Sequence, residues 1–123
     1  MSISIFYTAV RRHGLTDAEQ SAIAAVRSKY SQHDQIEKYL STGEGLNWES
    51  FSFYDPPLSS GAIIEGATKL PDNSEDASWI GVQHWCKALS ELRRAIPDAI
   101  WRVHVEDHDI PWDEGQQEYD PTK

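Results

Sequence analysis

Acidic and large apolar side chains are interleaved in the last twenty residues of the chain. Residues 104–123 contain seven carboxylates but only one base, Lys123. Ile110, Trp112 and Tyr119 lie among these acids. Aromatic side chains supply much of the energy of buried contacts, and a segment that only keeps a protein in solution has little use for them. The pattern therefore predicts an acidic and aromatic surface that binds something basic.

Other chemistries find little support in the residue pattern. His104 and His108 have acids beside them, but on a strand His104 shares its face with Glu106, and no third metal ligand stands at a standard spacing. The single cysteine, Cys86, falls on an apolar helical stripe, which favours an inert core thiol. The chain contains no nucleophile elbow, phosphate loop or dinucleotide fingerprint. We therefore expect no enzyme, no metal and no cofactor.

Composition limits the partners and the compartment. The chain has 123 residues, of which 39% are hydrophobic and 25% charged, as in a soluble domain large enough to bury a core. Its formal net charge of -9 disfavours nucleic acid and anionic membranes, since both require a cationic face. A lone cysteine cannot form an intrachain disulfide, and the first ten residues resemble neither a signal peptide nor a membrane span. A cytoplasmic protein is expected.

Apolar periodicity predicts the elements that position these side chains. Strands are expected where apolar and polar residues alternate, at residues 2–10, 48–54, 62–68 and 100–106. A capping box at Thr16–Glu19 opens a first helix, which runs to Tyr30, and a short helical turn is expected at 34–41. A long helix follows the N-cap-rich stretch 71–76 and ends before Pro97.

The resulting order is strand, helix, strand, strand, helix, strand. This order predicts an α+β fold of the ferredoxin-like type, a split βαβ sandwich with a four-stranded antiparallel sheet and two helices on one face. We expect a single domain over residues 1–123, with an acidic C-terminal extension at 107–123. In this topology the third and fourth strands end where the first two begin, so the acids that flank those positions should converge.

The convergent acids and the tail tryptophan form the predicted partner-binding surface. Acids would steer association with a basic protein, and a buried Trp would slow dissociation. The opposite end should be basic, through Arg11, Arg12, His13, Arg93 and Arg94. An alternative is that residues 110–112 fold back to cover the sheet edge or its open face and leave the acids solvated. The predicted contact residues are Asp72, Glu75, Asp76, Glu106, Asp107, Asp109, Trp112, Asp113 and Glu114.

The uncovered face of the sheet offers a second hypothesis. Phe6, Tyr54, Arg102 and His104 should lie on it, where mixed aromatic and polar residues can bind a ligand or a second subunit. Two such sheets could pair around a pocket, as in a dimeric small-molecule-binding protein or enzyme. The simpler interpretation is a solvated face, which antiparallel sheets commonly have.

In its size, acidity and content of Trp and Tyr, the whole chain resembles bacterial immunity proteins. These proteins neutralise cognate antibacterial toxins, often through an acidic surface that contacts a basic toxin domain. No motif carries the resemblance, so it assigns no role to individual residues. It implies a protein partner of basic character and a role as a toxin inhibitor.

Overall fold

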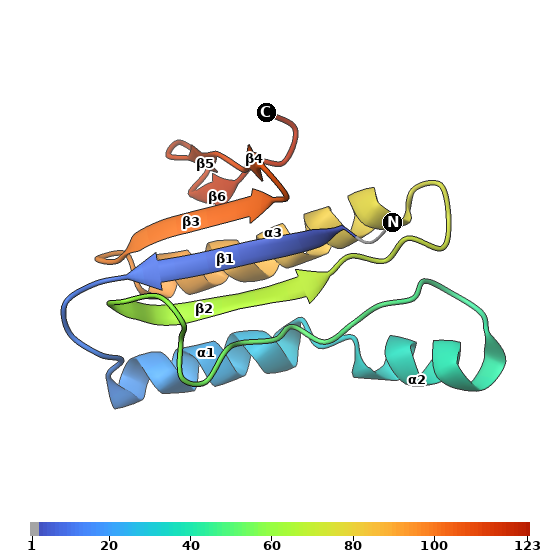
Figure 1. Cartoon of the computed structure of the whole chain (residues 1–123), viewed down its shortest axis with the longest axis horizontal. Coiled ribbons are helices and arrows are strands. Elements are labelled where there is room, and N and C mark those ends of the chain that lie inside the picture. The colour runs from blue at the N-terminus through green and yellow to red at the C-terminus, as the bar shows by residue number, and fades with distance from the viewer. Residues whose placement is uncertain (1–2) are drawn as a thin grey trace.

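The computed structural model describes residues 3–123 and is built on an antiparallel sheet in the order β2–β1–β3–β4 (Figure 1). Its strands are β1 (Ser4–Val10), β2 (Ala62–Lys69), β3 (Ile100–Val105) and the two-residue β4 (His108–Asp109). A separate hairpin pairs β5 (Trp112–Asp113) with β6 (Glu118–Tyr119). The α+β class and the four-stranded antiparallel sheet are confirmed, as are three of the expected strands within a residue or two. Ser2 lies outside the described residues.

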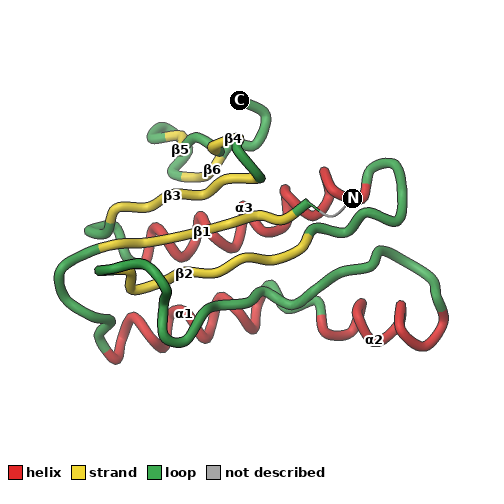
Figure 2. Tube along the Cα trace, in the orientation of Figure 1, coloured by secondary structure: helices red, strands yellow, loops and turns green. Residues whose placement is uncertain are grey.

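The helices are α1 (Asp17–Lys29), α2 (His33–Thr42) and α3 (Ala77–Ala95). The expected capping box is present. The Thr16 hydroxyl accepts a hydrogen bond from the Glu19 backbone amide, and the Glu19 carboxylate accepts one from the Thr16 backbone amide. Helices α1 and α3 pack against one another beside the sheet, whereas α2 extends away from it (Figures 1 and 2). None of the helices within residues 3–123 combines the length and the apolar character of a membrane span.

Strict alternation in β1 separates the buried face of the sheet from the open one. Ile5, Tyr7 and Ala9 are fully buried, whereas the residues between them are only partly covered. The buried face packs on α3, whose Trp85 and Leu89 are inaccessible to solvent. Burial of each such large apolar side chain stabilises the fold by about 1.5–3 kcal/mol. This alternation is the sequence signal that defined the strand.

Residues 48–54, expected as a strand, are extended but do not join the sheet ladder. The segment runs beside β2 and makes one backbone hydrogen bond to it, from the Tyr54 amide to the Glu65 carbonyl (2.7 Å). Its course crosses the buried face at Gly66, where a Cβ atom would lie 2.1 Å from the Ser52 carbonyl oxygen. The segment thus covers the outer edge of β2, which would otherwise expose unpaired backbone groups.

Hydrogen bonds from side chains of the sheet hold this segment where ladder hydrogen bonds are missing. The Ser52 carbonyl accepts a hydrogen bond from the Tyr7 hydroxyl, and its amide donates to the Thr68 hydroxyl (3.3 Å). Phe51 of the same segment is buried, with its ring stacked on Trp85 at 5.0 Å. The alternation of Phe51 and Phe53 therefore predicts that the side chains of this segment are buried. Whether its backbone joins the ladder depends on hydrogen-bond partners far away in the sequence, which a local pattern does not reveal.

The acidic C-terminal residues fold back onto α3. Ile110 and Tyr119 are each only 5% exposed, and the Tyr119 amide donates to the hydroxyl of Ser90 on α3 (2.9 Å). The Arg94 guanidinium donates to the Gln117 carbonyl oxygen (2.6 Å), which fixes the tip of the β5–β6 hairpin at the end of the helix. Ile110 lies at the edge of β3, as the alternative interpretation expects, but Trp112 packs against Arg93 of α3 and not on the sheet.

Candidate protein-binding surface

Two acidic loops are fastened together at the end of the molecule where β1 starts. The Asn47 amide nitrogen donates to the Asp72 carboxylate (2.7 Å), and the Asp72 backbone amide donates back to the Asn47 side-chain oxygen (2.8 Å). The Asn73 side chain donates to the Gly45 carbonyl (2.9 Å). The Asn47 hydrogen bond lowers the pKa of Asp72, which therefore remains charged. These bonds bring the acids around residues 44–49 next to those at 72–76.

A third acidic segment joins this end through the sheet. The Glu106 carboxylate accepts the Ser4 amide at 3.2 Å, and Ser4 is paired with Lys69 on its other side. Neighbouring strands are about 4.8 Å apart, so Glu106 and Lys69 are separated by roughly 10 Å. Seven exposed carboxylates therefore share one end of the molecule, here called the acidic end. They belong to Glu44, Glu49, Asp72, Glu75, Asp76, Glu106 and Asp107.

Three of the predicted contact acids are not at the acidic end. Glu114 lies beside Arg94 and Pro97, past the C-terminal end of α3. Asp76 precedes the same helix, and the rise of 1.5 Å per residue separates positions 76 and 94 by about 27 Å. Asp113 is near the Lys123 ammonium (3.9 Å), and Asp109 pairs with Arg102 (2.9 Å). The expected convergence is corrected accordingly: the β5–β6 hairpin carries Asp113 and Glu114 away from the strand ends, and Asp109 on β4 is paired with Arg102.

The expected basic end is also partly neutralised. The Arg11 side chain is only 4% exposed, and its guanidinium pairs with the carboxylates of Glu19 and Asp98. The Arg11 hydrogen bonds lower the pKa of Glu19 to about 2. These acids offset part of the positive charge at that end of the molecule.

Trp112 is engaged within the protein. The Arg93 guanidinium lies 4.3 Å from the centre of the Trp112 ring, and the Trp112 and Tyr119 rings meet edge to face at 5.0 Å. A cation–π contact of this kind contributes about 0.5–1 kcal/mol when partly exposed. Because the ring is half-buried against Arg93, its predicted role as a contact for a partner remains a prediction that the fold does little to support.

A different tryptophan is exposed next to the acidic end. Trp79 and Ile80, in the first turn of α3, are 43% and 42% exposed, and this turn begins directly after Asp76. Trp79 stands at helical spacing from Val82, Trp85 and Leu89, and this spacing predicts that it is buried with them. Adjacent residues on an α-helix point about 100° apart. A helix with one buried stripe therefore does not bury both Trp79 and Ile80 to the same extent. Two large apolar residues in succession, Trp79 and Ile80, are therefore the sequence signal for an exposed apolar turn.

The residues of the predicted open-face pocket are divided between two places. Phe6 and His104 stack on the open face with ring centres 5.0 Å apart and planes inclined by 12°. Arg102, beside them, is held by Asp109. Tyr54 instead lines a groove next to α1. Within residues 3–123 the four side chains do not enclose a common cavity.

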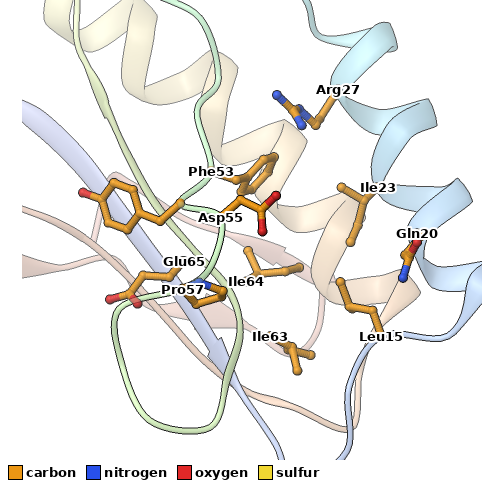
Figure 3. Close-up of a pocket in the computed structure, with 11 residues that line it drawn as sticks. Leu15, Gln20, Ile23, Arg27, Phe53, Asp55, Pro57, Ile63, Ile64 and Glu65 are labelled. Atoms are coloured by element: carbon orange, nitrogen blue, oxygen red, sulfur yellow. The ribbon is translucent and has the colours of Figure 1, made fainter.

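The groove beside α1 has a volume of about 450 Å³ (Figure 3). Figure 3 shows Gln20, Ile23 and Arg27 of α1 on one side, with Phe53 of the segment 48–54 and the following Asp55 facing them. The Arg27 guanidinium lies 4.8 Å from the centre of the Phe53 ring. Aliphatic and aromatic side chains form much of the lining, and no nucleophile stands beside a general base there. The groove can hold an apolar group, but its residues specify no reaction.

Buried polar groups elsewhere serve the core. Burial raises the pKa of the Cys86 thiol to about 12, as expected for an inert cysteine. His84 is half-buried among the rings of Tyr30, Trp48 and Trp85, and burial lowers its pKa. In the part of the chain that the structure describes, no three His, Cys, Asp or Glu side chains come together in a way that could hold a metal.

Comparison of the chain with family models, with characterised proteins and with solved structures gives no match.

Proposed function

We propose that this chain is a non-catalytic binding protein that neutralises a basic toxin domain, as bacterial immunity proteins do. The observation that carries the proposal is the exposed apolar turn of α3, Trp79 and Ile80, beside the carboxylates of Glu75 and Asp76. Protein interfaces combine an aromatic anchor at the centre with charges at the rim. The acidic end offers both within one helical turn.

Charge gives this surface its preference for a partner. Seven carboxylates at one end of a chain of net charge -9 attract a cationic protein and repel an anionic one. Within residues 3–123, two of these carboxylates, Glu49 and Asp72, have a lysine nearby, and the Lys69 ammonium is 4.0 Å from each. Ion pairs this loose and exposed contribute little, so the negative potential remains available to a partner.

The chemistry of the chain supports inhibition by contact rather than by catalysis. The groove beside α1 lacks a catalytic constellation, and the thiol of Cys86 is buried. Binding of a toxin domain at the acidic end would block its active surface or hold it inactive. The proposal includes a cytoplasmic location, where a producing cell must neutralise such a toxin.

We also propose that the fold is a variant of the ferredoxin-like sandwich. The adjacent strands β2, β1 and β3 correspond to the third, first and fourth strands of that topology and have its antiparallel order. The covering segment 48–54 runs where the second strand would lie. In this interpretation the segment that corresponds to the second strand no longer forms ladder hydrogen bonds but still lies next to β2.

The test is neutralisation of the protein encoded beside this chain's own gene. That protein should stop growth when expressed alone in a bacterial host and should be tolerated when co-expressed with this chain. Association of the purified pair, followed by surface plasmon resonance, should slow as salt rises because the acids steer the encounter. A neighbour that neither harms growth nor binds would contradict the proposal.

Variants locate the contact. Trp79→Ala should speed dissociation by about tenfold or more, as loss of a central aromatic anchor does. Tyr54→Ala is the matched control, since Tyr54 is also exposed (36%) but lies beside α1. Combined neutralisation of Glu75 and Asp76 to the amides should slow association and flatten its salt dependence. Unchanged kinetics in both sets of variants would exclude the acidic end as the binding surface.

A further inference from the structure

The groove beside α1 contains a guanidinium and a carboxylate that the fold leaves without an ion-pair partner. The Arg27 guanidinium lies 4.8 Å from the centre of the Phe53 ring and 3.5 Å from the Phe51 carbonyl oxygen. Among residues 3–123, no carboxylate comes within ion-pair distance of Arg27, and no cation comes within that distance of Asp55. The chain has 20 acids and 11 bases, so an arginine without an acid beside it is unusual here. Both charges remain available to a ligand.

The wall of the groove that carries Asp55 is held in place on both sides of this residue. Before it, the Tyr54 amide donates to the Glu65 carbonyl oxygen (2.7 Å). After it, the Glu65 carboxylate accepts hydrogen bonds from the amides of Leu58 (2.8 Å) and Ser59 (2.7 Å). Glu65 also lines the groove, but these bonds occupy its carboxylate, which leaves Asp55 as the acid that can contact a ligand. A site that is formed in advance spends less binding energy on ordering.

Apolar side chains line the groove beyond the two charges. Ile64 is buried, and Leu15, Ile23 and Ile63 are partly buried around it. Ile23 and Arg27 are four residues apart on α1, so an apolar side chain and the guanidinium are neighbours on the same face of the helix. The volume of about 450 Å³ is within the range of about 300–1,000 Å³ that is typical of small-molecule sites.

We propose that this groove binds a free amino acid with a large apolar side chain. The α-carboxylate of the ligand pairs with Arg27, its α-ammonium pairs with Asp55, and its side chain packs against the isoleucines. Phe53, under the guanidinium, and Asp55 are two residues apart, a separation of at most about 7 Å. This span accommodates a carboxylate and an ammonium on one carbon, each with a charge-assisted hydrogen bond of about 2.8 Å. Figure 3 shows Arg27 and Asp55 on opposite walls of the groove.

A zwitterion is the class of ligand that satisfies both charges at once. An apolar anion would meet Arg27 but would also lie beside Asp55, in a chain of net charge -9 that repels anions. An apolar amine would meet Asp55 but would bring a second cation close to Arg27. Exposed ion pairs contribute little by themselves, so burial of the ligand's side chain must supply part of the affinity. A small polar amino acid such as serine is therefore not expected to bind.

The groove is separate from the acidic end. It lies against residues 63–65, where β2 begins, whereas the acidic end surrounds Lys69, where β2 ends. The amino-acid site does not depend on the proposed toxin contact, and either proposal can fail while the other holds.

Titration of the whole chain with L-leucine, followed by the amide chemical shifts in NMR spectra, tests the site. Saturable shifts are expected in α1 and in residues 53–65, with a dissociation constant on the order of 100 μM. Isocaproate, which lacks the ammonium, and isoamylamine, which lacks the carboxylate, should each bind about tenfold or more weakly. The absence of saturable shifts with both L-leucine and L-phenylalanine up to about 10 mM overturns the proposal. Equal affinity for leucine and either analogue also overturns it.

Two variants assign the charges individually. Arg27→Gln should weaken leucine binding by about tenfold and leave isoamylamine binding unchanged, because the missing carboxylate and the missing guanidinium are partners. Asp55→Asn should likewise weaken leucine and leave isocaproate unchanged. Arg12→Gln and Asp34→Asn, at exposed positions outside the groove, are the matched controls and should bind leucine as the unmodified chain does. A variant that weakens leucine and both analogues equally would overturn the assignment, since this is the effect of a distorted groove.

Discussion

The hydroxyl group of Tyr7 donates a hydrogen bond to the backbone carbonyl of Ser52 and meets the hydroxyl of Thr68 at 2.8 Å. Tyr7 is central in the sheet, and Ser52 belongs to the segment that crosses its buried face. The contact thus joins the sheet to a segment that has almost no ladder of its own. Burial raises the pKa of Tyr7 to about 12, so its proton stays available for this bond.

Replacement of Tyr7 by Phe should loosen the covering segment. The Ser52 carbonyl would lose its donor in a partly buried site, and an acceptor left without a partner there costs about 1 kcal/mol or more. Urea unfolding followed by tryptophan fluorescence should show this loss in the free energy of unfolding. Tyr54→Phe, at an exposed ring, is the control. Equal stability of the two variants would mean that the Tyr7 hydroxyl is dispensable.

Substitution of Gly66 by Ala should destabilise the protein strongly. The new methyl group would lie 2.1 Å from the Ser52 oxygen and 2.8 Å from the Tyr7 ring, so the backbone of the covering segment must move. Overpacking of this kind costs about 1–3 kcal/mol and sometimes more. Gly14→Ala provides the matched control, because nothing lies within 4 Å of its added Cβ. A thermal melt compares the two, and a Gly66→Ala melt equal to that of the control would refute the crossing.

The Arg11–Glu19 pair should make stability depend on acid pH. The Arg11 hydrogen bond lowers the pKa of Glu19 to about 2 from an ordinary value of 4.5. The pair therefore stabilises the fold fully above pH 4.5, and this stabilisation is lost as the pH falls towards 2. Glu19→Gln should lower the melting temperature at pH 6 and reduce its decline between about pH 5 and pH 3.

Asp17→Asn is the control for that measurement, since it neutralises another acid in the first turn of α1 without touching Arg11. Parallel pH profiles for Glu19→Gln and the unmodified protein would contradict the assignment.

Loss of the Trp112 ring should free the C-terminal hairpin. The ring covers the Arg93 guanidinium, which also donates to the Tyr119 hydroxyl (3.2 Å). Trp112→Ala should destabilise the hairpin by about 1–2 kcal/mol, which speeds its amide exchange by about tenfold. Hydrogen exchange with mass spectrometry should show this change within residues 110–120 and leave β1 unaffected. Faster exchange throughout the chain would instead indicate that the hairpin is part of the global core.

Cys86 should be unreactive in the folded protein. Its thiol is 2% exposed, and burial raises its pKa to about 12, so almost no thiolate exists at pH 8. Ellman's reagent should modify it only after addition of denaturant, when one thiol per chain should react. Rapid reaction of the native protein would show that the α3 face beneath the hairpin opens readily.

Local patterns in the sequence determined the helices and the central strands. Some patterns depend only on residues close together in the chain and can be recognised in the sequence alone. They include the Thr16–Glu19 capping box and the alternation through Ile5, Tyr7 and Ala9. The burial of Phe51 follows from the same kind of signal. Only the tertiary structure decided that its segment leaves the ladder, because Gly66 and Thr68 supply the space and the hydrogen bonds from a distant strand.

The same division holds for the candidate surface. The sequence determined the excess of acids, and the order of strands correctly placed Asp72, Glu75, Asp76 and Glu106 at one end. Only the structure placed Glu114 beside Arg94, which is about 27 Å along α3 from Asp76, and covered Trp112 with Arg93, because both depend on how the hairpin packs along α3. Charge is a property of composition, but its position is set by contacts between residues far apart in the chain.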